Sequence, residues 1–354
     1  MIMEKQVPEL IPWIEGEPLG QRTSAVRWLQ KQVQNKSRRL PRQFDDLESW
    51  LAFRRHLRET LPKQIGIPTF PPIQAGAVRA RLQVSGDILC ERVDVYVDED
   101  YGIPALVFKP SQHSAPLPAL VWNPGYGENK WVRTYQSFAV RMARQGFLVL
   151  ILDHAPFGET TPYQMDDKAS FGMTVIMSLG DMLGYSQLGL RAAETRRAGE
   201  YLRRRSDVDP ARVAVAGLCQ GGMDTWLSAA LDETFCAAAC FCSASTFTIN
   251  GVELSSYHAL SDSSPYPFGI LDVCDVDHLH AAIAPRPLLV RANIPDHWWS
   301  VSGFSMIESL TRKIYRLFEA EDRLDMSSEV HEHNLTGPFA DSLENFLLKY
   351  LSNH

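Results

Sequence analysis

The feature that most constrains this chain is the segment of residues 213–222, Val-Ala-Val-Ala-Gly-Leu-Cys-Gln-Gly-Gly. Its apolar start, with valines at alternate positions, predicts a buried parallel strand. The run breaks into Gly-x-Cys-x-Gly-Gly, and residues 223–230 then favour a helix. Strand, glycine turn and helix form the layout of a nucleophile elbow, with Cys219 where serine usually sits. The glycines permit the strained turn that lifts a nucleophile above the sheet, whereas a buried cysteine in an ordinary turn is the alternative.

Composition limits the class of protein. The 354 residues are 45% hydrophobic and 22% charged, which suits one large α/β domain with additions, or two domains. Because the net charge is −7 and basic residues do not cluster with aromatic ones, we expect no nucleic-acid partner. The N-terminal residues lack a signal-peptide pattern, and no apolar run reaches about 18 residues, so we expect no membrane partner.

The six cysteines are not spaced as a disulfide framework. Cys236, Cys240 and Cys242 share one apolar stretch, where they can serve as small core residues. Their spacing on a strand suits a tetrahedral metal poorly, so we expect no metal and no other cofactor. Reduced thiols predict a cytoplasmic protein.

Residues 1–75 are predicted to be an N-terminal helical extension. Apolar residues at helical spacing predict helices over residues 24–34 and 44–61, with Pro41 before the second helix and Pro62 at its end. Two helices alone bury too little surface to fold, so they should pack on the main domain. There they could shape the entrance to the site or form a homodimer contact.

Residues 76–354 are predicted to form one α/β domain. Alternating patterns over residues 78–84, 93–97 and 103–108 indicate antiparallel lead-in strands. Strands and helices alternate afterwards, which predicts a mainly parallel twisted sheet with helices on both faces and a site beyond the carboxyl ends of its strands. The later strands are expected at residues 117–122, 147–152, 213–216, 237–243, 287–291 and 324–330, and the helices at residues 136–145, 185–205, 223–230 and 339–351.

A cysteine nucleophile needs a base, a group that orients the base, and donors for the developing oxyanion. In the elbow fold the acid and then the histidine follow the nucleophile along the chain. Asp296 is our preferred acid, because it lies in the loop leaving the strand at 287–291. Asp275 and Asp277 are alternatives, but they precede that strand and would more naturally cap a helix at residues 278–283.

The base should lie between the last strand and the closing helix. His333 is the preferred candidate, and His331 is the fallback, because two residues of an extended segment can face the same side. The backbone N–H of Gln220 should donate to the oxyanion. The second donor should be the N–H of Tyr126, which flanking glycines allow to turn inward; a plain turn after the strand is the alternative.

Residues 246–283 are the natural partial lid. We expect substrate contacts from Phe247 and Tyr257 in this segment, and from Trp298 and Trp299 after the acid. Such an aromatic lining suits a small molecule with an apolar or aromatic acyl group. The alternative is that these residues only pack the lid.

Several motifs together carry a family resemblance. Besides the elbow and His333, they are the segments at residues 102–110, 124–127 (Pro-Gly-Tyr-Gly), 153–159 and 284–289 (Ala-Pro-Arg-Pro-Leu-Leu). With them the chain resembles the α/β-hydrolase superfamily over about residues 87–351, specifically its dienelactone hydrolase-like and acetyl xylan esterase-like branch. The resemblance implies the triad Cys219, Asp296 and His333, and a structural loop at residues 153–159 beside the site.

Two residues depart from that pattern. Most esterases of the branch use serine, whereas dienelactone hydrolase-like proteins use cysteine; Pro124 replaces a histidine usual in relatives. Polymer synthases share the Gly-x-Cys-x-Gly-Gly box, but they resemble this chain only there.

The sequence therefore predicts a cysteine-dependent hydrolase that cleaves an ester, lactone or thioester through a thioester acyl-enzyme. Because thioesters also react with amines, thiols and carbon nucleophiles, the second interpretation is an acyltransferase or cyclase. A third is a non-catalytic ligand-binding protein, which Pro124 would favour. A fourth is a serine enzyme into which Cys219 has been introduced.

Overall fold

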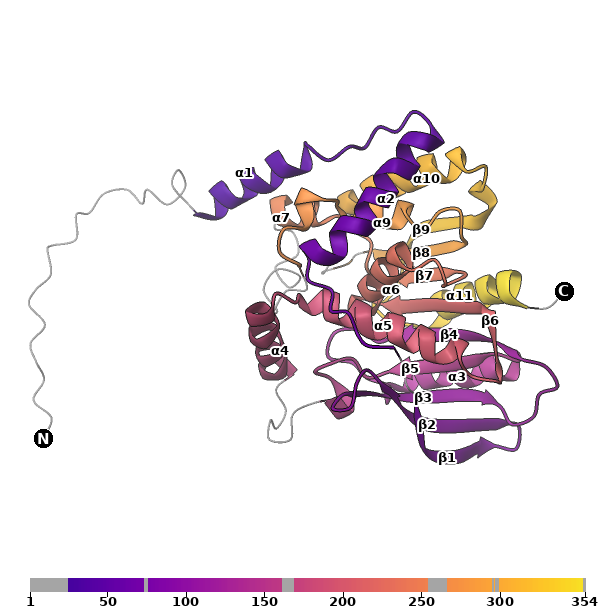
Figure 1. Ribbon diagram of the computed structural model, residues 1–354. Helices are drawn as coiled ribbons and strands as arrows, with labels where there is room; N and C mark the ends of the chain where they lie inside the picture. The colour runs from indigo at the N-terminus through magenta and orange to yellow at the C-terminus, as the bar shows by residue number, and fades with distance from the viewer. Residues whose placement is uncertain are drawn as a thin grey trace, which may run out of the picture.

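The computed structural model describes residues 25–72, 76–160, 169–253, 266–294, 296 and 299–352. Its centre is a nine-stranded sheet in the order β1-β2-β3-β5-β4-β6-β7-β8-β9 (Figure 1). The pairs from β1 to β5 are antiparallel, and every pair from β5 through β4 to β9 is parallel. This arrangement confirms the predicted α/β class, its mainly parallel sheet and its antiparallel lead-in strands.

The elements alternate along the chain as predicted from β4 onward. The strands are β1 Ala77–Ser85, β2 Ile88–Tyr96, β3 Gly102–Pro110, β4 Leu117–Asn123, β5 Leu148–Leu152, β6 Val208–Leu218, β7 Ala238–Phe241, β8 Leu288–Ile294 and β9 Leu324–Val330. The helices are α1 Ala25–Ser37, α2 Leu47–Gln64, α3 Arg133–Arg144, α4 Ala169–Leu183, α5 Gln187–Arg203, α6 Gln220–Leu231, α7 Phe247–Glu253, α9 Val276–Ala281, α10 Val301–Leu317 and α11 Gly337–Leu351, with short 3-10 turns between some of them.

The central strands are buried on both faces, so their alternate residues enter two different cores. In β4, Ala119 and Val121 belong to one core, and Leu120 and Trp122 to the other. Helices α2, α5, α6, α9 and α10 contribute to the first core, whereas α3 and α11 contribute to the second (Figure 1). A continuous apolar run is therefore what a parallel strand between two helical layers requires.

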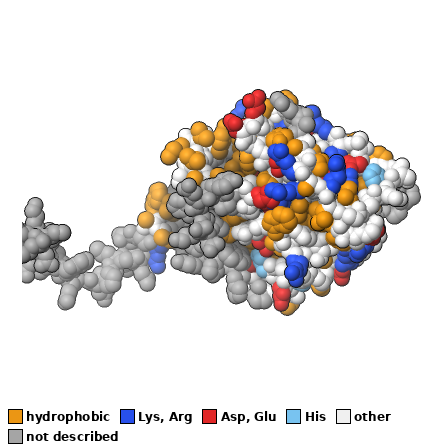
Figure 2. Space-filling view, turned by 90° about the horizontal axis from the view of Figure 1, so that it is seen from below, with side chains coloured by type: hydrophobic (Ala, Val, Ile, Leu, Met, Phe, Trp, Pro, Cys, Tyr) orange, Lys and Arg blue, Asp and Glu red, His pale blue; other side chains and the backbone are white. Residues whose placement is uncertain are grey.

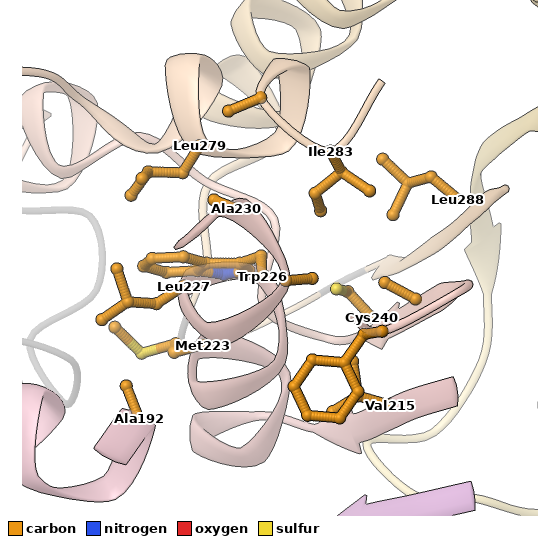
Figure 3. Close-up of a cluster of buried hydrophobic side chains, with 14 of the residues drawn as sticks. Ala192, Val215, Met223, Trp226, Leu227, Ala230, Cys240, Leu279, Ile283 and Leu288 are labelled. Atoms are coloured by element: carbon orange, nitrogen blue, oxygen red, sulfur yellow. The ribbon is translucent and has the colours of Figure 1, made fainter. Parts of the chain in front are cut away.

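Helix α6, which follows the elbow, is buried along almost its whole length. Figure 3 shows Trp226 of this helix at the centre of an apolar cluster, with Met223 and Leu227 beside it and Leu279 and Ile283 above. Trp226 has no exposed surface. Because each such side chain contributes about 1.5–3 kcal/mol on burial, the packing holds the start of α6 in one position.

Helix α2 packs on the main domain through Trp50, Leu57 and Leu61, all fully buried. The prediction that Pro62 ends this helix is wrong, because α2 continues to Gln64 with Pro62 inside it. Proline weakens a helix by removing one N–H. Here the last turn persists because Leu61 and the following Ile65 are buried in the core.

Helices α4, α7 and α10 have no counterpart in the predicted order. Helix α10 links the parallel strands β8 and β9, a connection that parallel pairing demands. A sequence signal for it exists, because Ser300 caps the helix with its side chain and Phe304, Ile307 and Ile314 follow at helical spacing. Helix α4 precedes α5 and carries exposed Met182 and Leu183.

Part of the segment predicted as a lid, residues 246–283, belongs to the core of the main domain. Its C-terminal part is core, because Val276, Leu279 and Ile283 are fully buried against α6. Asp275 caps α9, as predicted for an aspartate at this place. Residues 254–265 lie outside the described part of the chain.

Apolar side chains also remain at the antiparallel edge of the sheet. Strand β1 is exposed along most of its length, including Leu82 and Val84. Figure 2 views the molecule from the end at which Figure 1 places β1, and apolar side chains lie there among basic and acidic ones. Within the described residues, no helix combines the length and apolar character needed to cross a bilayer.

The tightest packing at the elbow yields a stability prediction. A Cβ added at Gly221 would lie 1.9 Å from the carbonyl oxygen of Asn123, whereas one added at Gly86 meets nothing within 4 Å. We expect Gly221→Ala to lower the free energy of unfolding by about 3 kcal/mol, because backbone must move to admit the methyl group. The control Gly86→Ala should change it by less than about 0.5 kcal/mol. Equal unfolding midpoints in denaturant titrations of both variants would contradict this packing.

Candidate active site

Cys219 lies at the sharp turn between β6 and α6. Its backbone has φ 57° and ψ −120°, a region that residues with a Cβ rarely adopt. Two hydrogen bonds hold the strained residue: its N–H donates to the carbonyl oxygen of Phe241 (2.8 Å), and its carbonyl oxygen accepts from the N–H of Met223 (3.2 Å). The side chain is half-buried. This conformation is that of the predicted nucleophile elbow.

The three elbow glycines are needed because other atoms occupy the space of a side chain. A Cβ at Gly217 would lie 2.2 Å from the carbonyl oxygen of Gly221, and one at Gly222 would lie 2.3 Å from Ser243 Oγ. Gly221 itself lies against Asn123 and Pro124, at the end of β4. The glycines therefore bring the first turn of α6 against the loop that should supply an oxyanion donor.

His333 and Asp296 lie together beyond the carboxyl ends of β8 and β9. His333 Nδ1 is 3.5 Å from Asp296 Oδ2, and the Asp296 side chain is almost fully buried. Burial lowers the pKa of His333, but the neighbouring Asp296 and Cys219 outweigh burial and raise this pKa to about 10. Cys219, Asp296 and His333 therefore interact in the structure, although 77 residues separate Cys219 from Asp296 in the sequence (296 − 219).

His331, the fallback base, has different contacts. Its ring nitrogens lie 2.6 Å from the carbonyl oxygen of Glu332 and 3.0 Å from that of Thr336, and its ring stacks on Phe339 at 3.9 Å. Asp275, an alternative acid, accepts hydrogen bonds from the N–H groups of Phe247 and Val276. His331 and Asp275 thus stabilise local backbone, away from the group formed by Asp296 and His333.

Cys242 also lies near the predicted triad. Its sulfur, an Asp296 oxygen and a His333 ring nitrogen lie within 4.8 Å of one another, which makes them the one set of side chains in the described residues that could bind a metal ion together. A metal held there would occupy the acid and base that the predicted chemistry needs. Cys242 itself is buried at the end of β7, with φ 50°.

The loop after β4 passes close to the nucleophile. The N–H of Gly125 donates to Glu128 Oε2 (3.0 Å), and the N–H of Glu128 donates to the carbonyl oxygen of Gly125 (3.2 Å). A Cβ at Gly125 would lie 3.5 Å from Cys219 Cβ. The ring of Tyr126 is half-buried and packs edge-on against Phe157, with centroids 5.2 Å apart. Tyr126, the residue predicted to supply an oxyanion donor, therefore follows a glycine that lies near Cys219.

Arg191 of α5 binds the start of this loop. One guanidinium nitrogen donates to the carbonyl oxygen of Pro124 (3.1 Å), and the group also binds Asp224 of α6 (2.7 and 2.9 Å). Arg191 and Asp224 are both buried. The sequence did not identify either residue, because an Arg and an Asp inside helical segments look like surface residues until tertiary packing buries them.

A second buried network joins α5 to the ends of β4 and β5. His154 lies 2.6 Å from Glu194 and 3.0 Å from Asn123 Oδ1, and Tyr101 donates to Glu194. Burial lowers the pKa of His154 to about 3 and raises that of Glu194 to about 7. His154 is therefore neutral at physiological pH. The resemblance implied a structural loop at residues 153–159, and His154 has such a role.

The loop at residues 153–159 also anchors the far end of the β4 loop. Asp153 Oδ1 accepts from the N–H of Lys130 (2.8 Å), and the buried Lys130 ammonium pairs with Asp153 and Glu159. The loop that carries Tyr126 is thus tied down on both sides.

The predicted substrate-binding aromatics are only partly described. Phe247 and Trp299 are both buried in the core, Phe247 against Tyr266 and Trp226. Their surroundings favour the alternative that these two residues pack the fold. Tyr257 and Trp298 lie outside the described residues.

Comparisons with known proteins identify the fold. Residues 103–259 match the dienelactone hydrolase family. The protein YtaP of Bacillus subtilis (strain 168), named as a hydrolase, is 24% identical over 262 residues, which cover 70% of this chain and 83% of that protein.

Solved structures agree with that match. A protein from Bacteroides fragilis described as an acetyl xylan esterase superposes with a TM-score of 0.69 at 17% identity, covering 85% of this chain and 81% of that one. The methylesterase BT1017 gives 0.64 at 18% identity, covering 90% and 68%. A glucuronoyl esterase from Solibacter usitatus gives 0.62 at 14% identity, covering 87% and 94%. Together these findings confirm the predicted α/β-hydrolase fold.

The environments of the six cysteines predict selective labelling. Burial raises the pKa of Cys90 and Cys236 to about 11 and that of Cys240, Cys242 and Cys274 further. Since the thiolate is the reactive species, limiting iodoacetamide at pH 7.5 should modify Cys219 first, beside the protonated His333. Peptide mass mapping over time provides the measurement. Earlier modification of any other cysteine would contradict the site geometry.

Proposed function

Because this chain is an α/β-hydrolase that matches the dienelactone hydrolase family over residues 103–259, we propose that it cleaves carboxylic esters with Cys219 as its nucleophile. His333 is the acid and base, and Asp296 orients it. The observation that carries the proposal is the interaction of His333 with both Asp296 and the strained Cys219 at the end of β6. That constellation supports the proposed roles of nucleophile, histidine and acid.

The high pKa of His333 defines the starting state. A histidine with a pKa of about 10 carries a proton at neutral pH. In the proposed mechanism, Cys219 acts as the thiolate beside this imidazolium. Asp296 stabilises the imidazolium. Attack on the ester carbon then requires no preceding proton transfer, unlike attack by a serine hydroxyl.

Acylation forms a bond between Cys219 Sγ and the carbonyl carbon. The electron pair of the C=O bond moves to oxygen, where the N–H groups of Gln220 and Tyr126 stabilise the charge. Gln220 is the first residue of α6, and the first N–H groups of a helix have no partner within it. Collapse of the intermediate breaks the ester C–O bond, and His333 gives its proton to the departing alkoxide.

Deacylation uses His333 in its neutral form. Water attacks the thioester carbon while His333 takes one of its protons, and collapse of the second intermediate releases the carboxylic acid and restores the thiolate. The imidazolium is thereby regenerated. Another acceptor in place of water would make the same intermediate a transferase intermediate.

The ester preference rests on the relatives. The three solved proteins above carry the names of an acetyl xylan esterase, a methylesterase and a glucuronoyl esterase. They support an ester over a lactone or thioester as the substrate. The ligand-only interpretation had Pro124 as its support. Arg191 donates to the carbonyl oxygen of Pro124, a backbone contact that does not depend on the proline side chain. All six cysteines are free, which supports the proposed cytoplasmic setting.

The choice between the two histidines can be tested directly. His333→Ala should lower kcat for p-nitrophenyl acetate by about 10³-fold or more, because the acyl-enzyme loses the base that activates water in deacylation. His331→Ala is the matched control and should keep activity within a few-fold, with lower thermal stability, since it contacts only backbone and Phe339.

Intact-mass measurement completes this test. A +42 Da acetyl adduct should form on the native protein and be absent in Cys219→Ala. Full activity without Cys219 would sink the proposal. With added amines or thiols, the ratio of the amide or thioester product to the free acid compares acyl transfer with hydrolysis.

The pH dependence tests the role of Asp296. Acylation needs protonated His333, so kcat/KM should fall as pH rises through about 10, where the raised pKa of His333 places the loss of its proton. In Asp296→Asn the attraction that raises this pKa is gone, and the alkaline limb should move to lower pH. Asp341→Asn, on the exposed surface of α11, is the control that should leave the profile in place. If the alkaline limb of the kcat/KM profile did not move in Asp296→Asn, the partner that raises the pKa of His333 would be a residue other than Asp296.

A further inference from the structure

We propose that Glu128 is a positioning residue that, together with Tyr135, fixes the loop carrying the Tyr126 N–H against Cys219. The inference rests on the proposed function, because it concerns the oxyanion donor of the same reaction. Neither Glu128 nor Tyr135 belongs to the predicted triad or to the expected substrate contacts.

The loop is closed by two hydrogen bonds between the same two residues. Glu128 accepts from the N–H of Gly125 with its side chain, and donates its own N–H to the carbonyl oxygen of Gly125. Tyr126 and Gly127 form the tip between them, with Gly127 in the left-handed region at φ 73°. The Gly125 N–H is therefore bound to the Glu128 carboxylate, which sets the direction of this N–H. The tip of the loop is oriented together with it.

Tyr135 of α3 holds the carboxylate in place. Its hydroxyl donates to Glu128 Oε2, the same oxygen that receives the Gly125 N–H. The Tyr135 side chain is buried next to Trp122 of β4. Burial and the adjacent Glu128 raise the pKa of Tyr135 well above its ordinary value, so the phenol keeps its proton and remains a donor. The Glu128 side chain thus connects helix α3 to the glycine loop at residues 124–128.

The distances place this arrangement at the nucleophile. A Cβ built on Gly125 would lie 2.5 Å from Glu128 Oε2 and 3.5 Å from Cys219 Cβ. On the other side of the loop, Arg191 fixes the carbonyl oxygen of Pro124. A shift of Gly125 therefore moves the next N–H relative to Cys219, and misplacement by about 1 Å can cost about 10²-fold in rate.

Glutamine provides the test of position against charge. Glu128→Ala should lower kcat about 10²-fold with little change in KM, because the donor is misplaced in the transition state. In Glu128→Gln, the amide oxygen can still accept from Gly125 and Tyr135, so activity should stay within about threefold of the native protein. Tyr135→Phe should fall between the two. Glu308→Ala, which removes an exposed ion pair on α10, is the surface control.

Iodoacetamide labelling of Cys219 separates the loop from the nucleophile. Alkylation develops no oxyanion at a carbonyl, so its rate and pH dependence should be unchanged in all of these variants while ester turnover falls only in Glu128→Ala and Tyr135→Phe. An unchanged labelling rate also shows that each variant is folded.

Several results would overturn the inference. One is full ester turnover in Glu128→Ala. Another is a loss of turnover in Glu128→Gln equal to that in Glu128→Ala, together with a shifted pH profile of Cys219 labelling, which would mean that Glu128 acts through its charge on the thiol. Native protein whose Cys219 is neither labelled nor required for turnover would instead overturn the proposed function. The two failures are therefore distinguishable.

Discussion

The close contact between Gly221 and the carbonyl oxygen of Asn123 is the constraint on which the site depends. It brings the first turn of α6 against the end of β4, and so places Cys219 beside the loop at residues 124–128. A side chain at Gly221 would force the two elements to move apart. The strain at Cys219 persists because apolar packing around Trp226 fixes the helix, and the Phe241 carbonyl fixes the strand end.

The layer below the site contains buried charge. Arg191 and Asp224 are both almost fully buried and bound to one another, and Arg191 also holds Pro124. A buried ion pair adds little net stability relative to apolar residues, but loss of one partner leaves an uncompensated charge that costs about 3–5 kcal/mol. The Arg191–Asp224 pair is better explained by its effect on the geometry of the loop than by a gain in stability. A guanidinium can hold a carbonyl oxygen and a carboxylate in fixed places at once.

The cysteine and its surroundings form a consistent chemical unit. Among the six thiols, five are in places where burial raises the pKa, whereas Cys219 is half-buried beside a histidine whose pKa is raised to about 10. A histidine with that pKa suits a thiolate, which needs a stable counter-charge, more than a serine, which needs a neutral base.

The sequence alone determined the features that depend on local pattern. Alternating and continuous apolar runs placed the strands, with β9 predicted to the residue, and the glycines around Cys219 predicted the elbow. Chain order also selected Asp296 and His333 for the site. The prediction missed α10, although the cap at Ser300 was an available signal. It also placed the end of α2 too early, at Pro62, where burial of Leu61 and Ile65 overrides the proline.

Only the tertiary structure separated residues of the same type. His331 and His333 are equivalent in the sequence, but folding places one against Phe339 and the other against Asp296. Glu128 and Arg191 look like ordinary surface residues until β4, α3, α5 and α6 come together around the loop at residues 124–128. The physical reason is that periodicity and turn chemistry act over a few neighbours, whereas burial and the partners of a charged group depend on segments far apart in the chain.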